Sequence, residues 1–344
     1  SVTQTEFLNE ENRLVKSFKL IDPDKKFYSG THEIIEPFVS KTSPYSTSFK
    51  EDSLWKKWSG SEDDYKENEL RGISKAEDCY FCVTSLTIDT SKYDEELLVD
   101  AMLNDFEFDL KDKEFSMVKK HKSLPFSFYE LKASRSVDDE VNDYYFEVYI
   151  SDNSVFAFAT WGERKSPNLE STHKELRASI ELTDREPDKF EKLDTFTKHA
   201  QADLLSNLGN SYYGAKKYKT AADLYLKSYT IHPEQKHIVT NYFWATSNLK
   251  DYDTILKFLE DKEHLLENPN ILSWRAFSRN QLNTLEDACS DYLKLFSKYD
   301  YSEDNDFQEA INLHAKVNKF DNLYKMTRKL LQVEVLFHPI FPLI

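Results

Sequence analysis

The stretch LSNLGNSYYGAKKYKTAADLYLKSYTIHP, residues 205–233, decides the fold of the C-terminal half of this chain. Small and large side chains fall in it where two packed antiparallel helices need each. Gly209 and Ala221 would let the two helices approach closely, and Pro233 would end the second helix. The residues that would fill the space beside them are Leu205, Leu208, Tyr212 and Tyr225. The stretch therefore predicts one helix-turn-helix unit.

The same spacing recurs further along the chain. The positions that align with the glycine are Gly209, Phe243, Ala276 and Ile311, which lie 34, 33 and 35 residues apart. This pattern resembles the tetratricopeptide repeat, a helix pair with a period of about 34 residues. The resemblance implies an all-α array of four repeats. In the second and fourth copies Phe243 and Ile311 replace the small residue, whereas Ala288 and Tyr292 restore the second-helix pattern in the third.

The negative charge of the chain is concentrated in its N-terminal half. The net charge is −16, yet residues 192–332 contain 19 basic and 19 acidic side chains. An acidic excess repels phosphate backbones and anionic lipids, so we expect neither nucleic acid nor a membrane surface as a partner. A basic protein or peptide would be favoured. The simpler interpretation is that the charge only keeps the domain soluble.

The N-terminal half has the patterns of a mixed domain. Residues 144–150 and 155–161 alternate between apolar and polar side chains, and Ser151-Asp152-Asn153-Ser154 between them favours a turn, so a β-hairpin is expected. The other expected elements are strands over residues 80–88 and 126–131 and helices over residues 95–103 and 171–182. Together these predict an α+β domain with an antiparallel sheet and flanking helices.

This order of elements, with its late hairpin and a closing helix that carries Leu176 and Ile180, resembles the PsbP-like and DcrB-like domains over residues 38–182. The resemblance implies a small binding domain. It rests on element order and apolar pattern, so no functional residue is carried over from those families.

The division that follows has four parts. Residues 1–182 form the acidic α+β binding domain, residues 183–197 a charged linker that contains Pro187, and residues 198–332 the four repeats. Residues 333–344 form an apolar tail with Pro339 and Pro342. We expect this tail to cap the last repeat. The alternative is a remnant of a protease-cleavage linker, which Glu334-Val335-Leu336-Phe337 resembles.

Catalytic motifs are scarce. Cys79 and Cys82 have the spacing of a redox or metal motif, but they begin a predicted strand, where residues three apart point to opposite faces. Cys289 is alone on a repeat helix, and His232 and His237 have no cysteine near them. Only six glycines are present, and no phosphate-binding loop is found. We therefore expect no enzyme, no cofactor and no metal; the alternative is a thiol-dependent enzyme that uses Cys79.

The concave groove of the array is the expected binding site, because the exposed face of each first helix lines it. The residues expected to face inward are Ser206, Asn210, Tyr213, Thr240, Trp244, Ser247, Ser273, Phe277, Asn280, Gln308 and Asn312. Exposed aromatic side chains on such a surface are typical of a hot spot for peptide binding. Trp244 and Phe277 could equally pack between repeats, and the sequence leaves both interpretations open.

Some arrays of this family clamp a C-terminal carboxylate. This chain resembles them at Asn210 and Asn241. The positions of their cationic side chains are held here by Ser206, Asn270 and Trp274, with Arg275 one residue away. Without the cations most of the charge-assisted hydrogen bonds are lost, so we expect no carboxylate clamp.

The sequence thus predicts a non-enzymatic protein that binds a protein or peptide in its repeat groove, with the acidic domain contributing electrostatically. The alternative within binding is a bacterial effector chaperone or immunity-type inhibitor whose acidic domain covers a basic surface. The sequence contains no run that approaches the ~18 apolar residues of a membrane helix, so no membrane insertion is expected. We expect a cytoplasmic protein; because Ser1 is not a methionine, a lost signal peptide would be consistent with the sequence, and a periplasmic or secreted location is the alternative.

Overall fold

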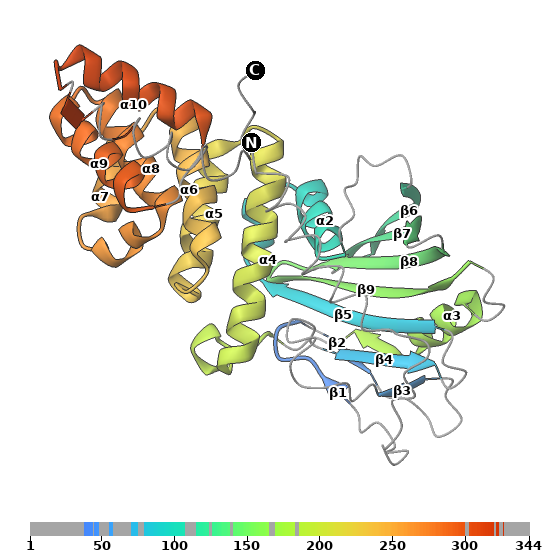
Figure 1. The fold of residues 1–344 in the computed structure, drawn as a ribbon. Coiled ribbons are helices and arrows are strands. Elements are labelled where there is room, and N and C mark those ends of the chain that lie inside the picture. The colour runs from blue at the N-terminus through green and yellow to red at the C-terminus, as the bar shows by residue number, and fades with distance from the viewer. Residues whose placement is uncertain are drawn as a thin grey trace, which may run out of the picture. The chain divides into compact units, whose positions relative to one another are not determined.

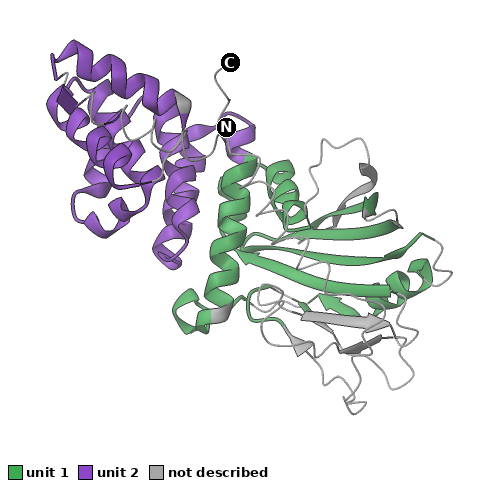
Figure 2. Cartoon of the chain, viewed as in Figure 1, with its two compact units in different colours: residues 1–211 green, residues 212–344 purple. Residues whose placement is uncertain are grey.

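In the computed structural model the chain forms two compact units, residues 1–211 (unit 1) and 212–344 (unit 2), shown in Figures 1 and 2. The residues that the structure describes are 38–43, 45–47, 55–57, 70–74, 79–106, 115–123, 126–137, 140–164, 169–182, 186–299, 303–319, 321–322 and 326. Unit 1 is an α+β domain with antiparallel sheets and unit 2 is helical, which confirms the predicted fold class.

The main sheet of unit 1 has the strand order β3-β4-β5-β9-β8-β7-β6 in the described part of the chain, and every neighbouring pair is antiparallel. Its strands are β3 (Trp55–Lys57), β4 (Leu70–Ser74), β5 (Cys79–Thr87), β6 (Phe115–Ser123), β7 (Phe126–Val137), β8 (Glu140–Ile150) and β9 (Ser154–Glu163). A smaller sheet has the order β1-β2-β10, formed by β1 (Phe38–Val39), β2 (Tyr45–Thr47) and β10 (Ile180–Leu182).

The predicted hairpin is confirmed as β8 and β9. At its turn the amide of Ser151 donates to the carbonyl oxygen of Ser154 over 2.9 Å, and the two hydroxyl oxygens are also 2.9 Å apart. The hydroxyl of Thr90 donates to the carbonyl oxygen of Ser151 over 2.6 Å. The turn is therefore held both by its own serines and by the segment that follows β5.

The predicted closing helix over residues 171–182 needs a correction. Helix α3 spans Leu169–Ser179, and the last three residues form strand β10 instead. The physical reason is a long-range pairing, because Ile180 and Leu182 lie opposite Thr47 and Tyr45 of β2. The helix predicted over residues 95–103 is confirmed as α2 (Glu95–Asn104).

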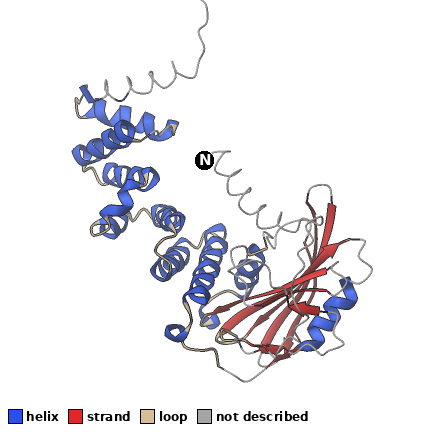
Figure 3. Ribbon diagram, turned by 60° about the horizontal axis from the view of Figure 1, so that its bottom comes forward, coloured by secondary structure: helices blue, strands red, loops and turns tan. Residues whose placement is uncertain are grey.

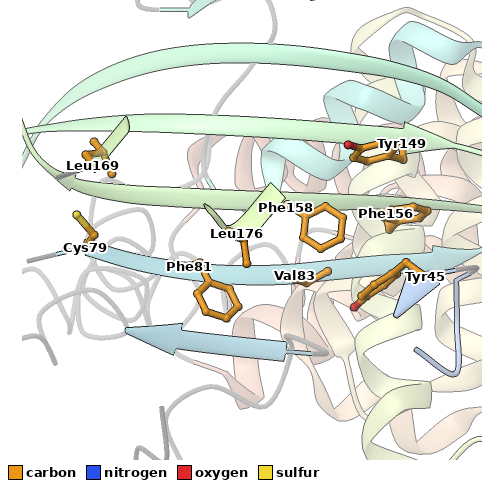
Figure 4. Packing of buried hydrophobic residues seen from close by; sticks show 9 residues of the cluster. All are labelled: Tyr45, Cys79, Phe81, Val83, Tyr149, Phe156, Phe158, Leu169 and Leu176. Carbon is orange, nitrogen blue, oxygen red and sulfur yellow. The ribbon is translucent and has the colours of Figure 1, made fainter. Parts of the chain in front are cut away.

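One face of the main sheet packs against α3 through a core of alternating strand residues (Figure 4). Side chains two positions apart on a strand share a face, which is why Cys79, Phe81 and Val83 of β5 and Phe156 and Phe158 of β9 enter the same core. The core residues are Tyr45, Cys79, Phe81, Val83, Tyr149, Phe156, Phe158, Leu169 and Leu176. Rings dominate it, and Tyr149 and Phe156 stack at 5.1 Å between centroids.

The opposite face of the sheet packs against α2, so helices cover both faces (Figure 3). Phe106, just after α2, meets Phe146 of β8 edge to face at 5.3 Å. The hydroxyl of Tyr129 on β7 donates to Glu95 of α2 over 3.0 Å. This arrangement completes the antiparallel α+β layer that the sequence predicts.

A buried carboxylate attaches α3 to the sheet. The side chain of Glu147 on β8 is only 2% exposed, and it accepts a 2.6 Å hydrogen bond from the hydroxyl of Tyr149. From α3, His173 Nε2 lies 3.5 Å and Arg177 Nε 3.4 Å from Oε1 of Glu147. The other ring nitrogen of His173 hydrogen-bonds to the hydroxyl of Thr160 over 2.7 Å. Thr160 is fully buried, so this cluster positions a helix and offers no accessible nucleophile.

Helix α4 (Thr195–Gly214) begins in unit 1, where it closes an exposed edge of β5. Strand β4 pairs with β5 only as far as Val83, so later backbone groups of β5 need other partners. The amide of Gln201 provides them, because its Nε2 donates to the carbonyl oxygen of Ser85 over 2.5 Å and its Oε1 accepts from the amide of Thr87 over 2.7 Å. These bonds explain why the first turns of α4 belong to unit 1.

Unit 2 consists of helix pairs in the predicted register. Its helices after α4 are α5 (Tyr218–Ile231), α6 (Lys236–Asn248), α7 (Tyr252–Leu259), α8 (Pro269–Gln281), α9 (Leu285–Lys298) and α10 (Asp304–Lys316). Two residues after the end of each first helix the chain has a residue with positive φ, namely Lys216, Lys250, Asn283 and Asn318. These residues lie 34, 33 and 35 residues apart, the spacing that the sequence predicts. Unit 2 therefore has a TPR-like helical architecture.

The turn after each first helix repeats the same backbone hydrogen bond. The amides of Lys217, Asp251, Thr284 and Lys319 donate to carbonyl oxygens five residues earlier in the chain. Such a bond, made beside a left-handed residue, satisfies carbonyl groups at the end of a helix. Four equivalent turns fix where each second helix begins.

The chain divides into its two compact units after Ser211, inside α4. The expected linker, residues 183–197, lies within unit 1, and its role as a linker stays a prediction. Part of that linker contacts unit 1, because the amide of Asp188 donates to the carbonyl oxygen of Lys41 and Lys41 pairs with Asp194 at 3.5 Å. The predicted tail, residues 333–344, lies outside the described residues.

We predict that Glu147→Gln destabilises unit 1 by about 2 kcal/mol at neutral pH, because it removes the charge that His173 and Arg177 face. Burial raises the pKa of the Glu147 carboxyl, but hydrogen bonds from His173 and Tyr149 outweigh it and leave the pKa below its usual value. A lowered folded-state pKa gives stability above the unfolded pKa that is lost as the pH falls. Urea denaturation should therefore show a difference between wild type and variant that is constant near neutral pH and shrinks as the pH falls below the usual pKa of glutamate; a difference that stays constant in acid would contradict this account.

Candidate functional site

The first helices α6 and α8, together with the start of the second helix α7, bring together an aromatic cluster that consists of Trp244, Tyr252, Trp274 and Phe277. Trp244 of α6 meets Trp274 of α8 edge to face, with ring centroids 4.8 Å apart and ring planes at 85°. Trp274 meets Phe277 at 5.8 Å, and Phe277 meets Tyr252 at 5.7 Å, both also edge to face. Edge-to-face contacts at these distances are attractive, so the cluster is a specific arrangement of rings.

The aromatic cluster runs from the surface into the core of unit 2. The Trp244 side chain is 49% exposed, the largest such fraction among the exposed large hydrophobic side chains of the described residues. Behind it, Trp274 contacts Phe243 at 6.3 Å, and Phe243 is fully buried. Phe243 in turn meets Phe258 of α7 at 5.6 Å. Trp244 is therefore an exposed ring on a rigid support.

Hydrogen-bonding groups lie beside the aromatic cluster. The side-chain nitrogen Nδ2 of Asn248, one turn after Trp244 on α6, donates to the backbone carbonyl oxygen of Trp244 over 2.9 Å. It also lies 3.1 Å from the hydroxyl oxygen of Tyr213 at the end of α4. Tyr213 meets Tyr218 edge to face at 5.3 Å. These groups extend the aromatic surface with neutral donors and acceptors.

Helices α8 and α10 meet through polar contacts. The hydroxyl of Ser273 donates to a carboxylate oxygen of Asp306, and the amide of Asn280 donates to Oε1 of Glu309 over 2.5 Å. Burial raises the pKa of the Glu309 carboxyl, and the charge of Asp306 acts in the same direction. We call the set Ser273, Asn280, Asp306 and Glu309 the α8–α10 seam.

The predicted groove residues fall into three groups. Those that are buried are Ser206 and Ser273; those that are exposed are Asn210, Trp244, Gln308 and Asn312; and those between are Tyr213, Thr240, Ser247, Phe277 and Asn280. Ser206 and Asn210 belong to the part of α4 in unit 1. The structure brings Trp244 and Phe277 together through Trp274, and it joins Gln308 to Asn312 by a 3.2 Å hydrogen bond.

Sequence reasoning missed Trp274, Asn248, Asp306 and Glu309 as members of this surface. A signal for Trp274 was present, because it lies three residues before Phe277 and residues three apart share a helix face. The acids of α10 could not be placed in the same way, since their partners lie about 30 residues earlier in the chain.

The arginines of α8 are engaged in a buried ion pair. Arg275 makes two hydrogen bonds to Asp291 of α9, of 2.9 and 2.6 Å, and Arg279 makes a third of 2.6 Å. The Asp291 side chain is only 4% exposed. Arg275 is the one cation that a shifted register could have supplied to a carboxylate clamp, and here it supports the third repeat. The absence of a clamp stays a prediction.

The cysteines are buried in secondary structure. Cys79 and Cys82 lie within β5, and Cys289 lies within α9, where burial raises the pKa of its thiol. A nucleophilic thiol needs access to solvent and a lowered pKa. In the described part of the chain, no three His, Cys, Asp or Glu side chains gather closely enough to hold a metal ion. The described helices include none with the length and apolar character needed to cross a bilayer.

No family model matches this chain, and no curated protein matches it significantly. Several solved structures resemble parts of it. A structure of MamA from AMB-1 has 14% identity and a TM-score of 0.30, covering 38% of this chain and 77% of that one. A structure of pilF from Pseudomonas aeruginosa has 17% identity and a TM-score of 0.32, covering 48% and 70%. The structure of LpqN, involved in cell envelope biogenesis of Mycobacterium tuberculosis, has 14% identity and a TM-score of 0.28, covering 43% and 90%.

Likeness at this level carries no argument about function. The assignment of the helical half rests instead on the four equivalent turns and on the helix pairs between them.

We predict that Asp291→Ala destabilises unit 2 by about 3 kcal/mol, because it leaves Arg275 and Arg279 without their buried partner. The matched control is Asp287→Ala, an exposed acid in the first turn of the same helix, which should cost less than about 1 kcal/mol. Both values come from urea denaturation followed by circular dichroism. Equal effects of the two variants would show that the ion pair is not what holds α8 to α9.

Proposed function

We propose that the helix pairs of unit 2 bind a protein partner, and that a short segment of that partner docks on the aromatic cluster. The observation that carries this proposal is the half-exposed Trp244, supported edge to face by Trp274. Tryptophan on a rigid support is the side chain most often found at binding hot spots. Covering about half of a tryptophan, some 100 Å², would contribute roughly 2 kcal/mol.

The chemistry around the cluster favours a peptide over a small anion. Asn248 and Tyr213 offer neutral hydrogen-bonding groups of the kind that can pair with a peptide backbone. Arg275 and Arg279 are directed to Asp291, so the described part of α8 offers no cation fork for a carboxylate or a phosphate. Recognition of a partner would therefore rest on aromatic contacts and neutral hydrogen bonds.

We further propose that unit 1 is an acidic binding domain that resembles the PsbP-like and DcrB-like domains. Its negative charge would raise the rate of encounter with a basic partner. We keep the four-part division into domain, linker, repeats and tail as part of this proposal. No feature of the described residues favours an effector chaperone or an immunity-type inhibitor over other binding proteins.

The test uses the full chain and random twelve-residue peptides displayed on phage. Peptides that bind wild type are synthesised with a fluorescein label, and their dissociation constants are measured by anisotropy against wild type and Trp244→Ala. We expect binding to Trp244→Ala to be at least about tenfold weaker, because the outermost ring of the cluster is lost. Because Trp244→Ala also removes the buried half of the ring and its contact with Trp274, it should cost about 2 kcal/mol of stability, and circular dichroism must show that the variant is folded before its binding is compared.

The matched control is Leu226→Ala, which removes an exposed apolar side chain from the second helix α5. Its affinity for the same peptides should equal that of wild type. If no displayed peptide binds, or if every bound peptide binds Trp244→Ala as tightly as wild type, the aromatic cluster is not the binding site.

A further inference from the structure

The repeat register places an aromatic ring beside a carboxylate one repeat after the two tryptophans. Phe277 lies 33 residues after Trp244, and Glu309 lies 35 residues after Trp274, which are the spacings of the corresponding turns. Phe277 therefore takes the position of Trp244 in the next repeat, and Glu309 takes the position of Trp274. Where α6 and α8 meet, two rings occupy this pair of positions and are in edge-to-face contact; in the next repeat, where α8 and α10 meet, the register assigns the same two positions to a ring and a carboxylate.

Direct contacts agree with this register. Ser273, Phe277 and Asn280 lie at positions i, i+4 and i+7 of α8, so they share one helix face. Ser273 reaches Asp306 and Asn280 reaches Glu309. The two carboxylates, three residues apart on α10, thus lie along the face of α8 that carries Phe277 between its two polar residues.

The charge at this seam is acidic. Among the described residues, no lysine or arginine forms an ion pair with Glu309. The carboxyl is half-buried, and its neighbours are Asp306, the amide of Asn280 and the hydroxyl of Tyr292. A positive charge supplied from outside would be complementary to this end of the surface.

We propose that the segment docking on unit 2 carries a lysine or arginine, whose charge lies at Glu309 and whose aliphatic stem covers Phe277, while a neighbouring apolar residue packs on Trp244. This inference rests on the proposed function of the aromatic cluster. Packing of an aliphatic stem on an aromatic ring and a charge-assisted hydrogen bond to a carboxylate are both attractive, and the hydrogen bond favours a basic side chain over a neutral one. An acidic segment or a phosphate would be repelled.

The test starts from the displayed peptides whose binding depends on Trp244. We expect lysine or arginine to be enriched at one position beside an apolar residue. For each peptide, the basic residue is replaced by norleucine, which keeps the stem and removes the charge. On wild type this change should weaken binding about tenfold. On Glu309→Gln it should have little effect, because the contact between the basic residue and Glu309 is already absent from that variant. Asp306→Asn should act in the same direction.

The matched control for charge is Asp223→Asn, which removes one exposed negative charge from α5 and should leave peptide affinity unchanged. If Trp244-dependent peptides show no enrichment of basic residues, or if norleucine weakens binding equally on wild type and Glu309→Gln, the cation subsite is wrong while the aromatic cluster stands. If no peptide depends on Trp244, the cluster and the subsite both fail.

Folding of the variant is checked separately. We expect Glu309→Gln to unfold at the same temperature as wild type or higher near pH 7, because the pKa of the Glu309 carboxyl is raised, by burial first and then by Asp306. A raised folded-state pKa means that stability present at low pH is lost as the carboxyl ionises, and glutamine avoids that loss. The two melting temperatures should converge as the pH falls below the usual pKa of glutamate. A lower melting temperature of the variant at pH 7 would overturn this reading of the seam.

Discussion

The left-handed residue in the turn after each first helix is the constraint on which unit 2 depends. Because Lys216, Lys250, Asn283 and Asn318 recur at intervals of 33 to 35 residues, every second helix starts at the same point relative to its partner. A left-handed conformation costs about 1 to 2 kcal/mol for a residue with a Cβ atom, and asparagine tolerates it better than lysine. Its presence at two lysines shows that the turn geometry, and not the local sequence preference, sets these positions.

In unit 1 two polar side chains, in places where apolar ones are usual, fix the positions of helices relative to the main sheet. Glu147 occupies a core position on β8, and it is tolerated there because Tyr149, His173 and Arg177 surround its oxygens. Gln201 completes the hydrogen bonds at the edge of β5. A hydrophobic contact could hold α3 or α4 near the sheet, but these bonds fix the position of each helix along it.

The parts of the fold that were predictable from sequence are those set by local periodicity. The repeat register follows from Gly209 and its equivalents, and the hairpin follows from strict alternation on both sides of a turn. What could not be predicted depends on partners far away in the chain. The last residues of the predicted closing helix became β10 because they pair with β2, more than 130 residues earlier. Ser273 was expected to face the groove, yet it is buried because Asp306 on the next first helix reaches it.

The departures from the repeat pattern coincide with the candidate site. Phe243 stands where the first repeat has Gly209, and a small residue there would let the helices approach but would leave nothing behind Trp274. With a buried phenylalanine at that position, Trp274 is supported from within, and Trp274 in turn supports the exposed Trp244. The third copy has the small residue Ala276 again, and its ring at Phe277 is followed by a carboxylate instead of a second tryptophan. The departure of the second repeat from the pattern therefore has a physical consequence. Phe243 prevents the close helix packing that a small residue allows, and in its place it supports a ring, Trp244, that stays exposed at the surface.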